Sequence, residues 1–221
     1  MFKRSIAFSA AAFFGIMGAN SEALALSQES SGDRCYLIGT ADELDEFASI
    51  VNSSSSAFTG CAELTADIHY LGNANLLNSS RDGVTAVPQK QWTPLQNFAG
   101  TFDGQDHIIY GLYAKATTGG AGFIATSAGD AVVKNLHIAD SYFFSNTNNP
   151  CNGQKGTKAA CPDGAAGFVA YATGSSLTLE KCGFSGYVGG SVATSNGGLL
   201  GSASGSTRLN FANSFNEGYI F

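Results

Sequence analysis

A short pattern recurs through the second half of the chain, and it constrains the fold more than any other feature of the sequence. Each copy opens with a glycine followed by apolar residues, at 122–124, 167–169 and 198–201. A second apolar run follows each of these segments along the chain. One unit of this size cannot bury its own apolar side chains, whereas neighbouring units can share a continuous core. The pattern therefore predicts an all-β chain folded as a β-solenoid.

Two positions in the second apolar runs align the copies. With Ile109 and Leu112 as the reference pair, the spacings to successive copies are 24, 46 and 32 residues. The later pairs are Val133 and Leu136, Leu179 and Cys182, and Phe211 and Ser214. The longest interval contains a polar, glycine-rich stretch at about 145–164, which we interpret as a loop insertion.

Asparagine occupies an equivalent place in two of these copies, at Asn135 and Asn213, and Lys181 takes that place in the copy between them. A ladder of side-chain amides at a turn is one interpretation. Ordinary turn asparagines are the other, and the sequence leaves both open.

The composition agrees with many short strands closed by tight turns. Glycine accounts for 28 of 221 residues, apolar residues for 44% and charged residues for only 13%. The formal net charge of -6 argues against nucleic acid or an anionic membrane as a partner, because both require basic patches.

The first 25 residues have the features of a secretory signal peptide. Lys3 and Arg4 precede an apolar run at 6–17, and Ala23-Leu24-Ala25 supplies the small residues of a cleavage site. The apolar run is short for a membrane span, so cleavage is favoured over a retained anchor. We expect a mature chain that begins at Leu26, carries a net charge of -7, has no membrane span and is exported from a bacterium.

The mature chain is predicted to contain a flexible segment at 26–34 and one domain at 35–221. A helix is expected at about 41–52, with Thr40 as its N-cap and Glu43 three residues later. Its apolar stripe predicts that it covers the N-terminal end of the solenoid. That stripe consists of Leu44, Phe47, Ala48 and Val51.

The other end of the domain carries no such cap. The last residues, Tyr219, Ile220 and Phe221, resemble the start of another strand. An open end exposes strand edges and core side chains. We therefore expect either that the chain continues beyond Phe221 or that a second molecule covers this end, with self-association as the outcome.

The stretch at 92–112, WTPLQNFAGTFDGQDHIIYGL, resembles the opening module of bacterial surface proteins that carry GLUG repeats. Their repeat is similar to GGLLGSASGSTRLNFANSFNEG in this chain, and the resemblance extends over about 35–221. It implies a right-handed parallel β-helix that is secreted or displayed at the cell surface, as in adhesin-like proteins. The family has no shared catalytic residues. This chain differs in having few repeats, a cysteine-flanked insertion and no recognisable anchor.

Five cysteines in an exported chain predict two disulfides and one remaining thiol. Cys35 and Cys61 flank the expected helix, and Cys151 and Cys161 bracket the insertion, so these are the expected pairs. Cys182 occupies an inward position of the repeat and is interpreted as a buried, apolar-like residue. The alternative is a reactive nucleophile, which would require a basic partner.

Asp103, Asp106 and Asp140 are the candidates for catalysis, because glycoside hydrolysis requires two carboxylates about 5–10 Å apart. Asp103 and Asp106 lie in a glycine-flanked turn, where aspartate is favoured for structural reasons. Asp140 follows the same rule, so turn residues are the favoured interpretation for all three.

Aromatic residues are the candidates for binding a sugar, and the alternative is that they pack around the first repeat. They are Trp92, Tyr110, Tyr113 and Tyr142. The three histidines, His69, His107 and His137, lack the close spacing of a metal site, so neither a metal nor a cofactor is predicted.

Together these features favour a secreted or surface-displayed protein without enzymatic activity, adhesin-like, which attaches to a glycan or a host surface. The alternatives are a carbohydrate-active enzyme, either a polysaccharide lyase or a glycosidase, and a scaffold segment of a larger surface protein. The question of enzymatic activity stays open at this point.

Overall fold

The computed structural model describes residues 26–28, 34–72, 74–146, 164–191 and 195–221. The predicted signal peptide, Cys151 and Cys161 lie outside these residues, as does nearly all of the predicted insertion. The elements in chain order are β1 (Tyr36–Ile38), α1 (Ala41–Ser53), β2 (Cys61–Leu64), β3 (Ile68–His69), β4 (Thr101–Asp103), β5 (Ile108–Tyr110), β6 (Tyr113–Ala116), β7 (Ile124–Ser127), β8 (Asp130–Ser145), β9 (Ala165–Ala166), β10 (Val169–Ala172), β11 (Ser176–Gly190), β12 (Asn196–Gly197), β13 (Leu200–Ala203), β14 (Arg208–Ala212), β15 (Phe215–Asn216) and β16 (Tyr219–Ile220).

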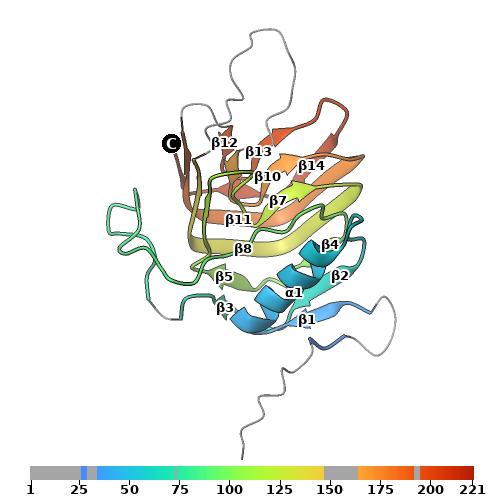
Figure 1. Ribbon diagram of the computed structural model, residues 1–221, viewed down its shortest axis with the longest axis horizontal. Helices are drawn as coiled ribbons and strands as arrows, with labels where there is room; N and C mark the ends of the chain where they lie inside the picture. The colour runs from blue at the N-terminus through green and yellow to red at the C-terminus, as the bar shows by residue number, and fades with distance from the viewer. Residues whose placement is uncertain (1–25, 29–33, 73, 147–163, 192–194) are drawn as a thin grey trace, which may run out of the picture.

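Parallel pairing joins these strands into one large sheet and two small ones. The large sheet has eleven strands, with the main order β1-β2-β4-β8-β11-β14. β7, β10 and β13 form a three-stranded sheet, and β9 pairs with β12. In Figure 1 the colours run from blue at the α1 end to red at the opposite end, so the strands follow one another in space nearly as they do in sequence.

The prediction of a right-handed parallel β-helix is wrong. A β-solenoid would divide its strands among equivalent sheets, whereas here eleven strands belong to one sheet and the other sheets hold three and two. The strands are also unequal: β8 has 16 residues and β11 has 15, while the others have two to five. Three short strands, β4, β5 and β6, all pair with different parts of β8. The short-strand pattern of the sequence did not reveal these two continuous strands.

The register of the later copies agrees with the sequence alignment. Val133 pairs with Leu179, and Leu179 pairs with Phe211. The glycine-led segments also align as expected, with Val169 between Ile124 and Leu200.

The register of the first copy was predicted wrongly. Ile109 pairs with Ile138, and it is Phe102 that pairs with Val133. The chain between Phe102 and Ile109 is two residues longer than the chain between Val133 and Ile138. The extra residues form a turn in which Gln105 and Asp106 adopt left-handed backbone conformations, with φ of 50° and 62°.

Asn135, Lys181 and Asn213 all adopt a left-handed backbone conformation with φ of 51°. Asparagine adopts this conformation more readily than most residues. The Asn135 side chain donates a hydrogen bond to Asp103 over 2.9 Å. Since Lys181 takes the same conformation without an amide, these positions are explained as turn residues.

The single helix among the described residues lies where the sequence predicts it. The Thr40 hydroxyl accepts from the Glu43 N–H, and Glu43 reaches back to the Gly39 N–H. The predicted apolar stripe is buried. The Phe47 ring lies 5.5 to 5.9 Å from the rings of Tyr36, Phe58 and Phe102, so α1 covers the interior beside β1 and β4 (Figure 1).

Part of the segment predicted to be flexible packs against this end of the domain. Leu26 is buried, and its N–H donates to the Glu46 carboxylate over 3.1 Å. The Leu37 N–H donates to the Ser27 carbonyl over 2.9 Å. Residues 29–33 lie outside the described part of the chain.

Candidate functional site

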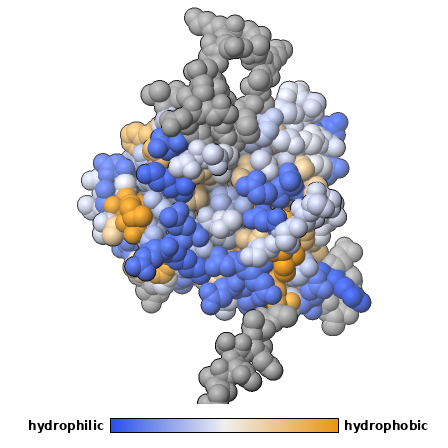
Figure 2. All heavy atoms as spheres, viewed as in Figure 1, coloured by the Kyte–Doolittle hydropathy of each residue, from blue (hydrophilic) through white to orange (hydrophobic). Residues whose placement is uncertain are grey.

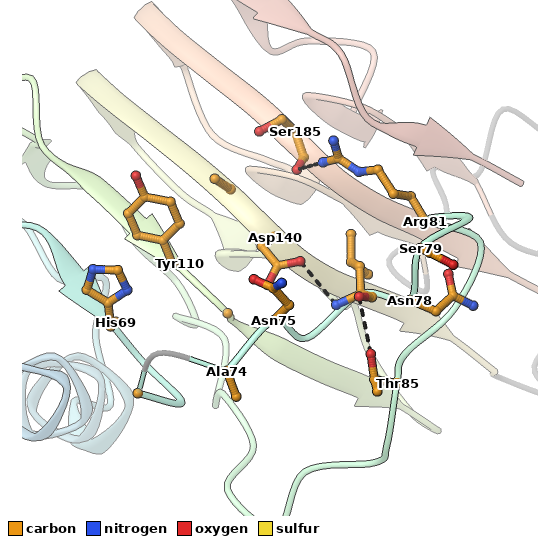
Figure 3. A pocket seen from close by; sticks show the side chains of 14 residues that line it. His69, Ala74, Asn75, Asn78, Ser79, Arg81, Thr85, Tyr110, Asp140 and Ser185 are labelled. Carbon is orange, nitrogen blue, oxygen red and sulfur yellow. Dashed lines mark hydrogen bonds between the residues drawn. The ribbon is translucent and has the colours of Figure 1, made fainter.

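An open groove of about 940 Å³ lies between the large sheet and the long connection that follows β3. Strands β3, β5, β8 and β11 form one side, and residues 72 and 74–85, called the groove loop here, form the other (Figure 3). Figure 2 shows the face of the molecule in this view as mainly hydrophilic, with separate hydrophobic patches. The groove is lined by His69, Gly72, Ala74, Asn75, Leu77, Asn78, Ser79, Arg81, Thr85, Tyr110, Gly111, Ala139, Asp140 and Ser185.

The floor of the groove follows one row of paired residues across four strands. His69 pairs with Tyr110, Tyr110 with Ala139, and Ala139 with Ser185. The His69 and Tyr110 rings are stacked with their centres 4.7 Å apart and their planes 4° from parallel. Since the two following side chains are small, the side of the Tyr110 ring away from His69 has no large neighbour within its row.

The groove loop is fixed to the sheet by Asp140. One carboxylate oxygen accepts from the Leu76 N–H over 2.6 Å, and the other accepts from the Leu77 N–H over 3.1 Å. Both carboxylate oxygens of Asp140 therefore bind backbone N–H groups of the groove loop. Within the loop, the Asn78 N–H donates to the Gly83 carbonyl, which closes a tight turn.

Arg81 is the cation that the groove loop carries over the sheet. Its Nη2 donates to the Ser185 carbonyl over 2.6 Å (Figure 3). None of the ion pairs in the described part of the chain includes Arg81. A guanidinium has five N–H donors in a planar fork, so others remain for an oxygen-rich ligand in the groove.

Asp103, a candidate catalytic carboxylate, is held by polar neighbours. Asp103 is buried and accepts from Lys134 over 3.0 Å and from Asn135 over 2.9 Å. Burial acts to raise the pKa of Asp103, but the bonds from Asn135, from the Gln105 N–H and from Lys134 outweigh it and lower the pKa. A carboxyl group with a lowered pKa is a poor general acid.

The other two aspartates occupy turn-like backbone. Asp106 is exposed with φ of 62°, and Asp140, with φ of 45°, holds the groove loop. Of the three candidates, only Asp140 lines the groove.

The four candidate aromatic residues separate into packing residues and one groove residue. Trp92 is 2% exposed and donates to the carbonyls of Gly122 and Phe123. Tyr113 and Tyr142 are stacked with ring centres 5.4 Å apart, and Tyr187 continues the stack at 4.7 Å. Burial, with the neighbouring tyrosines, raises the pKa of Tyr142 to about 12. Tyr110 is the candidate that lines the groove.

His107 and His137 contact different partners. His107 lies 3.1 Å from an Asp67 oxygen, and His137 lies 2.9 Å from the Ser185 hydroxyl. Burial lowers the pKa of His137. Within the described ranges, no group of three or more histidine, cysteine or acidic residues is placed to hold a metal ion.

Cys35, Cys61 and Cys182 lie in the described part of the chain. Cys35 and Cys61 form a disulfide at the start of β1 and β2, as predicted. Cys182 is fully buried, and its thiol donates to the Val133 carbonyl over 3.3 Å. Burial raises the pKa of this thiol to about 12, which leaves little reactive thiolate at neutral pH.

We expect Cys182 to resist alkylation in the folded protein and to react fully after denaturation. Iodoacetamide labelling followed by mass spectrometry measures both, and unreduced peptides from the same sample test the predicted Cys151–Cys161 bridge. A sample that is denatured and reduced before labelling exposes all five cysteines and serves as the control for labelling efficiency. Rapid labelling of native Cys182 would remove it from the core and restore the nucleophile hypothesis.

Several groove residues were not among the sequence candidates, namely Asn75, Asn78, Arg81 and Ser185. The predicted register placed Tyr110 beside Lys134, whereas the structure pairs it with Ala139. Because of this error in register, the sequence did not predict that small residues lie beside the Tyr110 ring. The Arg81-Asp82-Gly83 turn was visible in the sequence, but nothing local indicated that it would reach β11.

Comparison with known proteins adds little to this geometry. No family model matches the chain, and no curated protein matches it. Among solved structures, it is similar to "a putative immunoglobulin A1 protease from Bacteroides ovatus", with 16% identity and a TM-score of 0.41. That match covers 85% of this chain and 68% of the other. A likeness of this degree carries no argument about activity.

No helix in the described ranges is long and apolar enough to cross a membrane. The Cys35–Cys61 disulfide is consistent with an extracellular location, where such bonds persist.

Proposed function

We propose that this chain is a secreted or surface-displayed attachment protein that binds a glycan in the groove beside Tyr110 and has no catalytic activity. The observation that carries the proposal is the row His69-Tyr110-Ala139-Ser185, in which a stacked aromatic pair is followed by two small residues. A sugar ring presents C–H groups on its flat face, which pack well on an aromatic ring. Its hydroxyl groups require nearby hydrogen-bonding partners.

The groove loop provides such partners. Arg81 donates, the Asn75 amide both donates and accepts, and Ser79 supplies a hydroxyl. The Asn78 amide is bonded to Asp82 through both its nitrogen and its oxygen. An apolar surface combined with a few convergent polar groups is the usual composition of a small-molecule site. The predicted signal peptide at 1–25 supports a location outside the cell.

A carbohydrate-active enzyme is the competing function, and the groove favours it less. Its one acidic lining residue, Asp140, uses both oxygens to hold the loop. A glycosidase needs a second carboxyl group that can donate a proton. Asp103, with its lowered pKa and its bonds to Lys134 and Asn135, does not meet that requirement.

Binding of the full chain to oligosaccharides from pectin, xylan, cellulose and host glycans tests the proposal. We expect saturable binding to at least one class, and Tyr110→Ala to weaken it about tenfold, which corresponds to about 1.4 kcal/mol. Tyr171→Ala is the matched control, because Tyr171 is half-buried on β10 and does not line the groove. The measurement is titration calorimetry on ligands first identified on a glycan array.

Two outcomes would contradict the proposal. Equal loss of affinity in both tyrosine variants would place the ligand elsewhere. Turnover of a bound oligosaccharide that is abolished by Asp103→Asn or Asp140→Asn, with folding retained, would make the protein an enzyme.

A further inference from the structure

Arg81 reaches the groove from a strained backbone conformation. Its φ of 57° lies in the left-handed region, which residues with a Cβ rarely adopt. The Arg81 N–H donates to the Asn78 carbonyl over 2.9 Å, within the tight turn of the groove loop. Glycine adopts this conformation without cost, but it would place no side chain in the groove. Strain of this kind clusters at ligand sites, and here the turn directs a guanidinium toward β11 (Figure 3).

The sheet is irregular at the point where the groove loop meets it. Ala139 pairs with Ser185, and Tyr142 pairs with Tyr187, so two residues of β8 lie opposite one residue of β11. Such a β-bulge redirects side chains and is common beside functional sites. One of the two bulged residues is Asp140, with φ of 45°, whose carboxylate binds the loop. The bulge therefore lies where the groove loop is fastened to the sheet.

The positive charge of Arg81 has no acidic partner in the groove. Asp140 is the one acidic residue among the described groove residues, and its oxygens accept from backbone N–H groups. Asp82 follows Arg81 in sequence, but it is exposed, does not line the groove and accepts from the Asn78 amide over 2.8 Å. Arg81 is half-buried, so solvent screens its charge less than on an open surface.

The shape of the guanidinium favours one kind of anion. One of its five N–H donors is used on the Ser185 carbonyl, and its planar fork matches the two oxygens of a carboxylate. Along the floor of the groove, Tyr110 and Ser185 are separated by Ala139, which corresponds to two strand spacings or about 9–10 Å. That distance exceeds one sugar ring. A carboxylate on the sugar next to the one at Tyr110 is therefore in reach of Arg81.

We propose that the groove takes an acidic oligosaccharide, with one sugar ring against Tyr110 and the carboxylate of a neighbouring uronic or sialic acid bound by Arg81. The proposal rests on the proposed glycan site and names its substrate class. A neutral oligosaccharide would use the aromatic ring and leave the half-buried guanidinium without a charged partner. Discrimination between acidic and neutral glycans is therefore assigned to the groove loop, and sugar stacking to the sheet.

Titration calorimetry of the full chain with two pairs of ligands tests the proposal. The pairs are trigalacturonic acid with its methyl ester and sialyllactose with its methyl ester. Each ester retains every ring of its acid and lacks only the charge. We expect the wild type to bind the acid of at least one pair tenfold or more tighter than its ester, as a charge-assisted hydrogen bond supplies about that factor. The pair that shows the preference identifies the source of the carboxylate.

Arg81→Gln separates recognition of the charge from attachment of the loop. Glutamine can still donate to the Ser185 carbonyl but carries no charge. We expect this variant to lose about tenfold in affinity for the acid and to bind the ester as the wild type does. Arg208→Gln is the matched control, because Arg208 is exposed on β14 and does not line the groove. Its affinity for both ligands is expected to equal that of the wild type.

The outcomes separate this inference from the glycan site on which it rests. If the wild type binds acids and esters equally, or binds only neutral glycans, and Tyr110→Ala still weakens binding, the acidic preference is wrong and the glycan site stands. Equal losses for acid and ester in Arg81→Gln would also overturn the preference, since Arg81 would then only hold the loop. Absence of binding to any saccharide would overturn both proposals.

Discussion

Replacing Phe47 with aspartate is expected to unfold the domain at room temperature. The ring is fully buried and lies within 6 Å of the rings of Tyr36, Phe58 and Phe102. Loss of a buried phenylalanine costs about 3–5 kcal/mol, and an unpaired buried carboxylate adds several kcal/mol. The sum is comparable to the whole stability of a typical domain, about 5–15 kcal/mol. Circular dichroism and thermal melting measure the loss.

Ser49→Asp is the matched control for this change. It introduces the same carboxylate into the same helix at an exposed position, so the free energy of unfolding is expected to change by about 0.5 kcal/mol or less. Cooperative melting of Phe47→Asp within a few degrees of the wild type would show that α1 is not part of the core.

Removing the Cys35–Cys61 disulfide has the second largest expected effect. The bridge closes a loop with a sequence separation of 26 residues. On the chain-entropy model, a loop of this length contributes about 3–4 kcal/mol through restriction of the unfolded chain. For a domain of this size, we expect the double variant Cys35→Ala/Cys61→Ala to melt about 10 °C below the wild type.

Reductant provides the control for the disulfide prediction. In dithiothreitol the wild type and the double variant should melt at the same temperature, because the reductant removes the Cys35–Cys61 bridge from the wild type and the predicted Cys151–Cys161 bridge from both. A double variant that melts within about 2 °C of the oxidised wild type would show that packing of β1 on β2, rather than the bridge, holds this end of the domain.

The sequence was sufficient for features whose cause is local or repetitive. The helix follows from the spacing of Leu44, Phe47 and Val51 and from the Thr40 cap, all within one short segment. The pairing of Val133, Leu179 and Phe211 follows from repeated apolar runs of similar length. The disulfide follows from two cysteines that begin neighbouring strands.

The sheet and the groove depend on information that a local pattern does not carry. The sequence alignment placed Ile109 beside Val133, but Phe102 pairs with Val133. Ile109 belongs to the next apolar run and pairs with Ile138, which places Tyr110 beside Ala139. Glycine-rich runs were read as breaks between short strands, yet β11 continues through Gly183, Gly186 and Gly189. In a buried parallel sheet, glycine permits close approach of neighbouring chains, so its presence there did not end the strand.

The two attachments of the groove loop set an order of events during synthesis. Leu76 is bound by Asp140, 64 residues later, and Arg81 by Ser185, 104 residues later. Contacts between such distant residues form slowly, because the intervening chain must first be brought into place. The loop leaves the ribosome early and gains these two bonds only after β8 and β11 have been made. The groove beside Tyr110 is therefore completed only near the end of folding, and a nascent chain that stops before residue 185 has no complete groove.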